Sequence, residues 1–159
     1  AMNEIRNLSK SVLPPSLGEV GLINSLNDLV ANIENVHKLA FETHWENVHE
    51  NELCNKLQLT VYRIVQEQIN NVLKHSGASK VKIKLHQHGE RLQLSLLDDG
   101  SGFDSSIRRQ GVGIQNIIHR AELFNGKVEI ISHPGKGCEL KVDFINKEIL
   151  AINQLAQAG

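Results

Sequence analysis

Two oxygen-bearing side chains, Glu67 and Asn71, stand one helical turn apart and are followed by Lys74. A carboxylate and an amide oxygen are ligands that Mg²⁺ prefers, and a lysine ammonium suits a phosphate. At about 100° per residue, a helix places these side chains opposite an apolar stripe of Val61, Tyr62, Val65, Ile69, Val72 and Leu73. The pattern indicates a magnesium and phosphate site, although a solvated polar helix face would have the same pattern.

A second candidate cluster lies at the end of a predicted strand, where Asp98 is followed by Gly100 and Gly102. Because side chains alternate along a strand, Asp98 points to the same side as Leu92 and Leu96, which is the core side. A buried carboxylate requires hydrogen-bond donors, since burying an unpaired charge is costly. The amino group of a nucleobase is one such donor. The alternative is that Asp98 only begins an Asp-Asp-Gly turn.

A third cluster, Gly111, Val112 and Gly113, precedes a helix predicted to begin at Ile114. Glycine lets the backbone approach phosphate oxygens closely, and a helix N-terminus presents free N–H groups to them. Residues 105–110, just before this cluster, include two arginines and are predicted to form a mobile lid over bound phosphates. An ordinary flexible loop is the alternative for that stretch.

The remaining pattern predicts the elements that must position these side chains. Helices are expected at residues 3–12, 17–33, 52–76 and 114–124, with Gly77 as the stop of the third. Strands are expected at residues 36–41, 81–85, 92–96, 128–130 and 140–144, the second and third forming a hairpin. This order predicts the α+β class: a two-layer α/β sandwich with a mostly antiparallel sheet and helices on one face.

Composition limits the possible classes of protein. The chain has 159 residues, 40% hydrophobic and 22% charged, which predicts one globular domain. Its formal charge of -1 gives no general attraction to nucleic acid, and it has no apolar run long enough to cross a bilayer. Cys54 and Cys138 match no metal or redox spacing, which favours a reducing cytoplasm.

Four motifs follow one another along the chain: residues 67–75, 98–103, 111–114 and 135–137. Their order resembles the ATP-binding domain of sensor histidine kinases, in the superfamily shared with gyrase, the mismatch-repair ATPases and a heat-shock chaperone. The resemblance implies a Bergerat-type fold. Residues 8–22, with Pro14 and Pro15, further resemble the junction after the dimerisation helix in a NarX/DesK-like kinase subfamily. Together, the two resemblances imply three parts: the end of a dimerisation helix with its junction at residues 1–15, an ATP-binding catalytic domain at 16–146 and a C-terminal tail at 147–159.

The resemblance implies ATP and Mg²⁺ as cofactors and gives the candidate residues roles. Asn71 becomes the magnesium ligand, with Glu67 supporting it directly or through water. Both are expected to be catalytic together with Lys74, which lies with His75 on the phosphate side, while Asp98 reads adenine. The walls and lid are assigned to Gly100, Gly102, Gly111, Val112 and Gly113.

Cys138 departs from the family, which usually has threonine at this position near the adenine. Strand parity with Leu140 and Val142 still points Cys138 inward, so the pocket is expected to survive with one hydrogen bond weakened or lost. His86 and His88 share one strand face, but a solvated hairpin end is favoured over a metal site, and no transition metal is assigned.

The implied reaction is transfer of the ATP γ-phosphoryl to a histidine on a dimerisation domain, which lies upstream and is expected to be missing from this chain. The expected partners are that domain of the same protein and a response regulator, with no nucleic acid. The fragment is expected to be monomeric and the full-length protein a homodimer, with this domain cytoplasmic in a protein that can be membrane-anchored. The alternatives are an ATPase that uses hydrolysis for conformational work and a catalytically silent nucleotide-binding module.

Overall fold

The computed structural model describes residues 17–106, 111–145 and 158. Within these residues, the helices are α2 (Leu17–Val20), α3 (Leu22–Val36), α4 (Asn55–Asn71) and α5 (Val112–Glu122), with a 3₁₀ turn η1 (Glu50–Glu52) and a π-helical segment η2 (Val72–Ser76). The strands are β1 (Ala40–Glu46), β2 (Lys80–His88), β3 (Arg91–Asp98), β4 (Lys127–Ser132) and β5 (Cys138–Ile145). The predicted helix 3–12, the junction and nearly all of the tail lie outside the described residues, so the three domain limits stay predictions.

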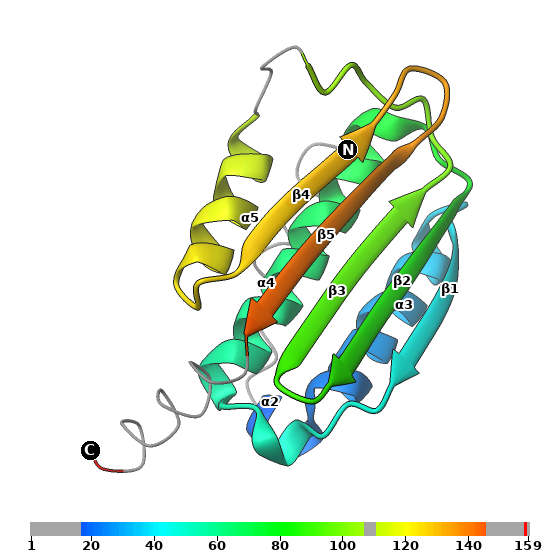
Figure 1. Cartoon of the computed structure of the whole chain (residues 1–159). Helices are drawn as coiled ribbons and strands as arrows, with labels where there is room; N and C mark the ends of the chain where they lie inside the picture. Colours follow the sequence, from blue (N-terminus) through cyan, green and yellow to red (C-terminus); the bar gives the residue numbers. More distant parts are fainter. Residues whose placement is uncertain (1–16, 107–110, 146–157, 159) are drawn as a thin grey trace.

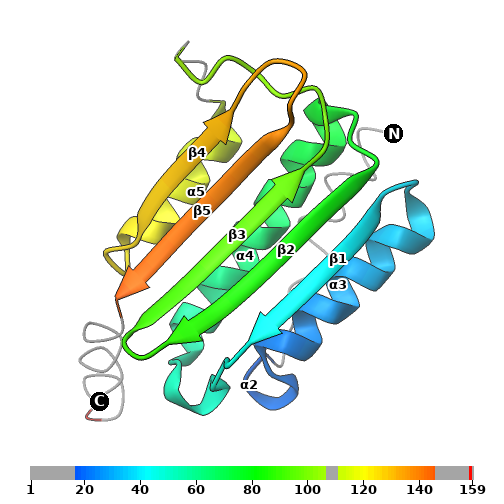
Figure 2. The same ribbon diagram turned by 45° about the vertical axis from the view of Figure 1, so that its right-hand side comes forward.

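The strands form one sheet in the order β1-β2-β3-β5-β4. β1 pairs with β2 in parallel, and the other three pairings are antiparallel. α3, α4 and α5 lie together on one face of this sheet, and the opposite face carries no helix among the described residues (Figures 1 and 2). The predicted two-layer α+β sandwich with a mostly antiparallel sheet is therefore confirmed.

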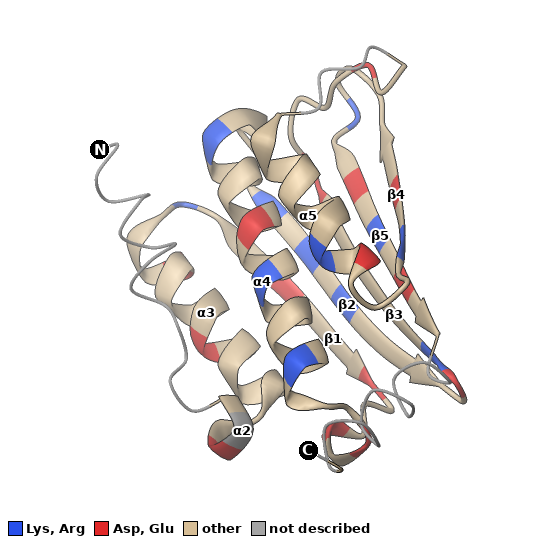
Figure 3. Cartoon of the chain, turned by 90° about the vertical axis from the view of Figure 1, so that its left-hand side faces the viewer, with Lys and Arg blue, Asp and Glu red and all other residues tan. Residues whose placement is uncertain are grey.

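The core lies between the helical layer and the sheet. Strand alternation directs Ile83 and Leu85 of β2, Leu94 of β3 and Val142 of β5 toward the helices, where all four are buried. The apolar stripe of α4 meets them, as the sequence predicted, with Val61, Tyr62, Val65, Ile69 and Val72 buried and Leu73 half-buried. Figure 3 shows both basic and acidic positions along α4.

The predicted helix over residues 17–33 is divided into α2 and α3 at Gly21. Gly21 has a φ of 86°, a left-handed conformation that glycine adopts at little cost. The Glu50 carboxylate lies against this break and accepts a hydrogen bond from the Ile23 N–H at 2.6 Å. A carboxylate is favourable at a helix N-terminus, and this distant residue caps α3. Periodicity could not reveal the break because the apolar positions continue across it.

The first predicted strand was placed too early. Residues 36–41 were expected to be extended, but α3 continues to Val36 and β1 begins at Ala40. β1 is an edge strand whose outward residues are Glu42, His44 and Glu46, so its sequence lacks apolar character on that face. β1 pairs with β2 in parallel, and α4 lies between the two strands in the sequence. A local sequence pattern does not encode such a non-local contact.

The predicted helix over residues 52–76 was correct except for its first residues and for the helical type of its last turn. α4 begins after Cys54, whose Sγ accepts a hydrogen bond from the Leu57 N–H at 3.4 Å. α-Helical geometry ends at Asn71 and is followed by η2, before Gly77 stops the element in a left-handed conformation as predicted. The fourth predicted helix also begins earlier than residue 114, because Gly111 is its N-cap and Val112 its first residue. No helix in the described part of the chain has the length and apolar character needed to cross a membrane.

Candidate functional site

Asp98 is the last residue of β3, and its side chain is buried with 3% exposure, as strand parity predicted. Its Oδ1 accepts a hydrogen bond from the Gly100 N–H at 2.9 Å. Burial raises the pKa of Asp98, and the neighbouring Asp99 adds to this, while backbone hydrogen bonds from Gly100 and Cys138 oppose it. The carboxylate is therefore under-solvated, and a ligand that donates a hydrogen bond to it would stabilise its charged form.

The glycine-rich segment after Asp98 is held between two parts of the fold. The Ser101 N–H donates to the carbonyl oxygen of Ser76, at the end of η2, at 2.8 Å. The Ser101 carbonyl accepts from the Gly135 N–H, in the β4–β5 turn, at 2.6 Å. A Cβ on Gly100 would lie 2.5 Å from the Ser76 carbonyl oxygen, so only glycine permits this approach. The end of η2, which continues α4, and the loop after Asp98 are therefore joined directly.

Asp99, the second aspartate of the motif, has a separate task. Its carboxylate accepts hydrogen bonds from the Ser79 N–H (2.8 Å), the Ser79 hydroxyl (2.8 Å) and the Lys80 N–H (2.9 Å). The hydrogen bond from the Lys80 backbone, followed by that from the Ser79 hydroxyl, lowers the pKa of Asp99. This clamp closes the beginning of β2 onto the end of β3. The sequence motif did not distinguish its role from that of Asp98.

Replacing Asp99 with asparagine is expected to lower the melting temperature at pH 7 by roughly 2 °C, a small change because the carboxylate is exposed. A lowered folded-state pKa contributes stability above the unfolded-state value of about 3.9 and loses it as the pH falls through the folded-state value. Thermal melts of Asp99→Asn and wild type should therefore converge below about pH 4. A difference that is constant with pH would mean that packing, and not the charge, stabilises this turn.

Cys138 begins β5 directly opposite Asp98 and is 8% exposed. Burial is the main cause that raises the pKa of its thiol to about 11, and the Asp98 charge adds to it, while a hydrogen bond with Ser132 opposes it. The thiol is therefore neutral at physiological pH. The predicted inward direction of Cys138 is confirmed. Its side chain lies beside the carboxylate of Asp98, the residue predicted to bind adenine.

Glu67 and Asn71 converge on the first turn of α5. A Cβ placed on Gly113 would lie 2.5 Å from the Asn71 Oδ1 and 2.8 Å from the Glu67 Oε1. The two oxygens therefore face one point, at which the α5 backbone lacks a side chain. A carboxylate and an amide oxygen gathered at one place fit a hard cation such as Mg²⁺. The Asn71 amide nitrogen meanwhile donates to the Gln68 Oε1 at 3.3 Å, which directs the oxygen away from Gln68.

The other candidate residues lie around these two clusters. Gly102 has a φ of 61° and packs on the backbone of the β4–β5 turn. Gly111 is exposed, and Val112 has 79% exposure, at the N-terminus of α5. Lys74 and His75 are exposed on η2, and no hydrogen bond or ion pair joins their side chains to Glu67 or Asn71. Residues 107–110 of the predicted lid lie outside the described residues.

A family comparison adds to this geometry. The profile of the histidine kinase-, DNA gyrase B-, and HSP90-like ATPase family matches residues 56–148, more than half of the chain. The chain belongs to this family. Membership of this ATPase family implies that the protein binds ATP. The match spans all three clusters, from α4 to the end of β5.

Solved structures of similar shape include several histidine kinases. The histidine kinase domain of a blue-light activated kinase from Erythrobacter litoralis EL346 superposes with a TM-score of 0.67 at 14% identity, over 96% of this chain and 78% of that chain. The Acinetobacter baumannii histidine kinase AdeS gives 0.62 at 12% identity, over 91% and 74%. The catalytic domain of the histidine kinase ThkA gives 0.60 at 12% identity, over 79% and 90%. At these identities, the likeness shows that this ATPase-family chain shares their fold.

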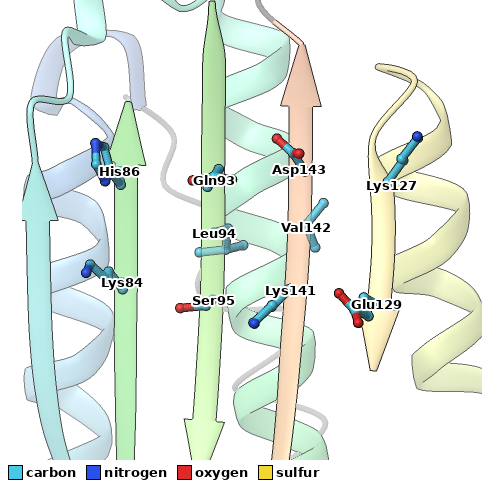
Figure 4. Close-up of a pocket in the computed structure, with 10 residues that line it drawn as sticks. All are labelled: Lys84, His86, Gln93, Leu94, Ser95, Lys127, Glu129, Lys141, Val142 and Asp143. Atoms are coloured by element: carbon cyan, nitrogen blue, oxygen red, sulfur yellow. The ribbon is translucent and has the colours of Figure 1, made fainter. Parts of the chain in front are cut away.

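A shallow concavity of about 390 Å³ lies elsewhere on this ATPase-family domain, on the uncovered face of the sheet (Figure 4). It contains none of the motif residues. Three of the residues that line it contact a carboxylate: Lys84 and His86 contact Glu46, and Lys141 contacts Glu139, at 3.3–3.8 Å. The ring centroids of His86 and His88 are 5.9 Å apart in an edge-on arrangement. Within the described residues, no group of three or more His, Cys, Asp or Glu side chains forms a metal site.

Proposed function

We propose that the chain is the ATP-binding catalytic domain of a sensor histidine kinase and donates the ATP γ-phosphoryl to a histidine on a dimerisation domain. The main support for the proposal is that a buried carboxylate and a pair of oxygen ligands lie on two segments that a backbone hydrogen bond joins. Asp98 lies on the base side, Glu67 and Asn71 lie on the phosphate side, and the Ser101–Ser76 hydrogen bond joins the two. The family match and the kinase folds support this reading.

Nucleotide binding begins with the base in this proposal. The buried Asp98 carboxylate accepts a hydrogen bond from the adenine amino group, which replaces solvation that burial has removed. The Cys138 thiol lies next to the carboxylate and presents a polarisable surface to the base, where a threonine hydroxyl would offer a stronger hydrogen bond. Because Gly100 and Gly102 have no side chains, the loop after Asp98 packs closely against Ser76 and His133.

The phosphates lie near the α5 N-terminus and the end of α4. The free N–H groups at the start of α5 favour phosphate oxygens, and the absence of a side chain at Gly113 lets the first turn of α5 lie close to the Glu67 and Asn71 oxygens. On the phosphate side, the exposed Lys74 of η2 supplies positive charge and the exposed His75 supplies a hydrogen-bonding ring nitrogen. Asn71 and Glu67 would hold Mg²⁺, which would neutralise part of the phosphate charge. The role of this chain is then to hold ATP in position for attack by the histidine.

The wider setting follows from the same proposal. The phosphoacceptor histidine belongs to a dimerisation domain of the same protein, and a response-regulator aspartate receives the phosphoryl next. The Pro14-Pro15 stretch supports a NarX/DesK-like subfamily. Dimerisation helices would make the complete protein a homodimer, with this catalytic domain in the cytoplasm and the possibility of a membrane anchor elsewhere in the protein. The isolated domain is then monomeric.

The test combines this chain with a separately produced dimerisation domain, Mg²⁺ and ATP labelled at the γ-phosphate. We expect acid-labile label on the histidine of the dimerisation domain, and none on a domain whose histidine is replaced by alanine. Release of labelled phosphate without labelled protein would favour an ATPase that performs conformational work. ATP binding without either product would favour a catalytically silent module. Both outcomes would overturn the kinase proposal.

A further inference from the structure

Ser132 ends β4 and has only 2% exposure, although none of the sequence motifs includes it. It lies directly opposite Cys138 of β5, which in turn lies opposite Asp98 of β3. These three polar side chains therefore form one buried row across three neighbouring strands. The row leads from the proposed adenine reader to the edge of the sheet, at the point where the chain enters the β4–β5 turn.

The Ser132 hydroxyl makes two hydrogen bonds to backbone groups. It donates to the Gly137 carbonyl oxygen at 2.9 Å and accepts from the Phe103 N–H at 2.9 Å. It also lies beside the Cys138 thiol and lowers the pKa of that thiol. A hydroxyl has one proton to donate, and Ser132 directs it to the Gly137 carbonyl oxygen, so the two backbone contacts fix the orientation of the hydroxyl.

The partners of Ser132 come from the two segments that frame the proposed adenine pocket. Phe103 follows the glycine-rich loop at the beginning of the segment that leads to α5, and Gly137 precedes Cys138 in the turn. Both segments are tightly packed: a Cβ on Gly102 would collide with the carbonyl groups of His133 and Gly137, and one on Gly137 with that of Asp98. Ser132 is thus a single side chain that hydrogen-bonds to both segments at their meeting point.

We propose that Ser132 is a positioning residue of the nucleotide site, whose hydroxyl fixes the segment beginning at Phe103 to the strand that holds Cys138 against Asp98. This inference rests on the proposed nucleotide-binding function and adds a residue to it. A smaller residue at 132 leaves the Phe103 N–H and the Gly137 carbonyl without their partner. Both walls of the pocket then lose their common support, while Asp98 itself stays unchanged.

The test is Ser132→Ala, measured by calorimetric titration with ADP at a temperature where the variant is fully folded. We expect binding to weaken by about tenfold. Two further signals should accompany this loss: faster hydrogen exchange at the Phe103 amide, and alkylation of Cys138 that shifts to higher pH, because the hydroxyl that lowers the thiol pKa is gone. General destabilisation alone would not move these two local signals together. The alkylation is measured in a Cys54→Ser background, since serine is also a favoured helix N-cap.

Ser95→Ala, a serine on the uncovered face of β3, is the matched control and should bind ADP as wild type does. If Ser132→Ala does not fold, Ser132→Cys in reducing buffer keeps the size of the side chain and should show a smaller loss in the same direction. ADP affinity within twofold of wild type in a folded Ser132 variant, with unchanged Phe103 exchange, would overturn the inference. A wild-type chain that does not bind ADP would instead overturn the proposed function.

Discussion

Replacing Asp98 with asparagine is expected to weaken ADP binding roughly 10- to 150-fold, because a hydrogen bond to a charged acceptor contributes about 1.5–3 kcal/mol. The neutral amide can still accept from the Gly100 N–H, but it does not reproduce the charged acceptor for the adenine amino group. The fold should persist, since the substitution keeps the size of the side chain. The affinity loss would therefore report the role of this carboxylate and not a collapse of the pocket.

The stability of the ligand-free Asp98→Asn variant should move in the opposite direction to its affinity. Burial raises the pKa of Asp98 in the folded protein. A raised carboxyl pKa means that its stabilising contribution is present below the unfolded-state value of about 3.9 and is lost as the pH rises through the folded-state value. At neutral pH, the charged group is a net cost to folding. We expect Asp98→Asn to melt at a temperature at least as high as wild type at pH 7.

Calorimetry with ADP and thermal melts without it measure the two effects separately. Asp143→Asn, on the uncovered face of the sheet, is the control and should leave ADP affinity unchanged. Adenine binding should also make wild-type affinity fall as the pH decreases through the raised pKa of Asp98, because protonation removes the acceptor. Wild-type ADP affinity in a folded Asp98→Asn variant would remove the carboxylate from the adenine site.

The sequence predicted best what depends on local alternation. The β2–β3 hairpin, the inward direction of Asp98 and Cys138, and the apolar stripe of α4 all follow from periods of two or 3.6 residues, and the structure has them. Errors occurred where tertiary contacts decide. The helix break at Gly21, which the sequence did not predict, is accompanied by a cap from the distant Glu50. The limits of β1 were predicted too early, and this strand pairs with β2, which is distant in the sequence.

In the candidate site, too, the features that depend on local spacing were predicted and those that depend on tertiary contacts were not. Residue types and spacing predicted Glu67 and Asn71 on one helix face, but not that Gly113 lies over both oxygens, since α4 and α5 meet only in the folded chain. The sequence also did not reveal the two residues, Asp99 and Ser132, that hold the segments around the site together. Asp99 resembled a second copy of Asp98, and Ser132 is an ordinary residue in an ordinary strand pattern. Their importance comes from backbone groups distant in sequence, which carry no side-chain signature.

The predicted line of Glu67, Asn71 and Lys74 on one helix face assumed a regular α-helix. The α-helical part ends at Asn71, and Lys74 belongs to the π-helical segment η2. A π-helix contains more residues per turn, so side chains after Asn71 are rotated relative to an α-helical continuation. The roles of Lys74 and His75 on the phosphate side remain predictions. Glu67 and Asn71 do not depend on η2, because both precede it.

Replacing Asn71 with alanine should therefore test the phosphate side of the site most directly. Asn71 is half-buried, makes a local hydrogen bond to Gln68 and does not belong to the apolar core, so its loss should change the melting temperature by no more than about 2 °C. ADP affinity without Mg²⁺ should remain close to wild type, since Asp98 is untouched. Mg²⁺ should strengthen ADP binding in wild type but not in the variant, because the amide oxygen that fits the cation is gone.

Phosphoryl transfer from ATP to a supplied dimerisation domain should decrease by about 100-fold or more in Asn71→Ala, because loss of a group that positions the cation and phosphates disturbs the alignment of the transfer. Asn116→Ala, an exposed asparagine on α5, is the matched control and should keep both the Mg²⁺ effect and the transfer. Undiminished transfer by Asn71→Ala would remove this helix from the magnesium site. A melting temperature lowered by roughly 8 °C or more, with the Mg²⁺ effect on ADP binding intact, would instead mean that Asn71 serves the fold, as on an ordinary polar helix face.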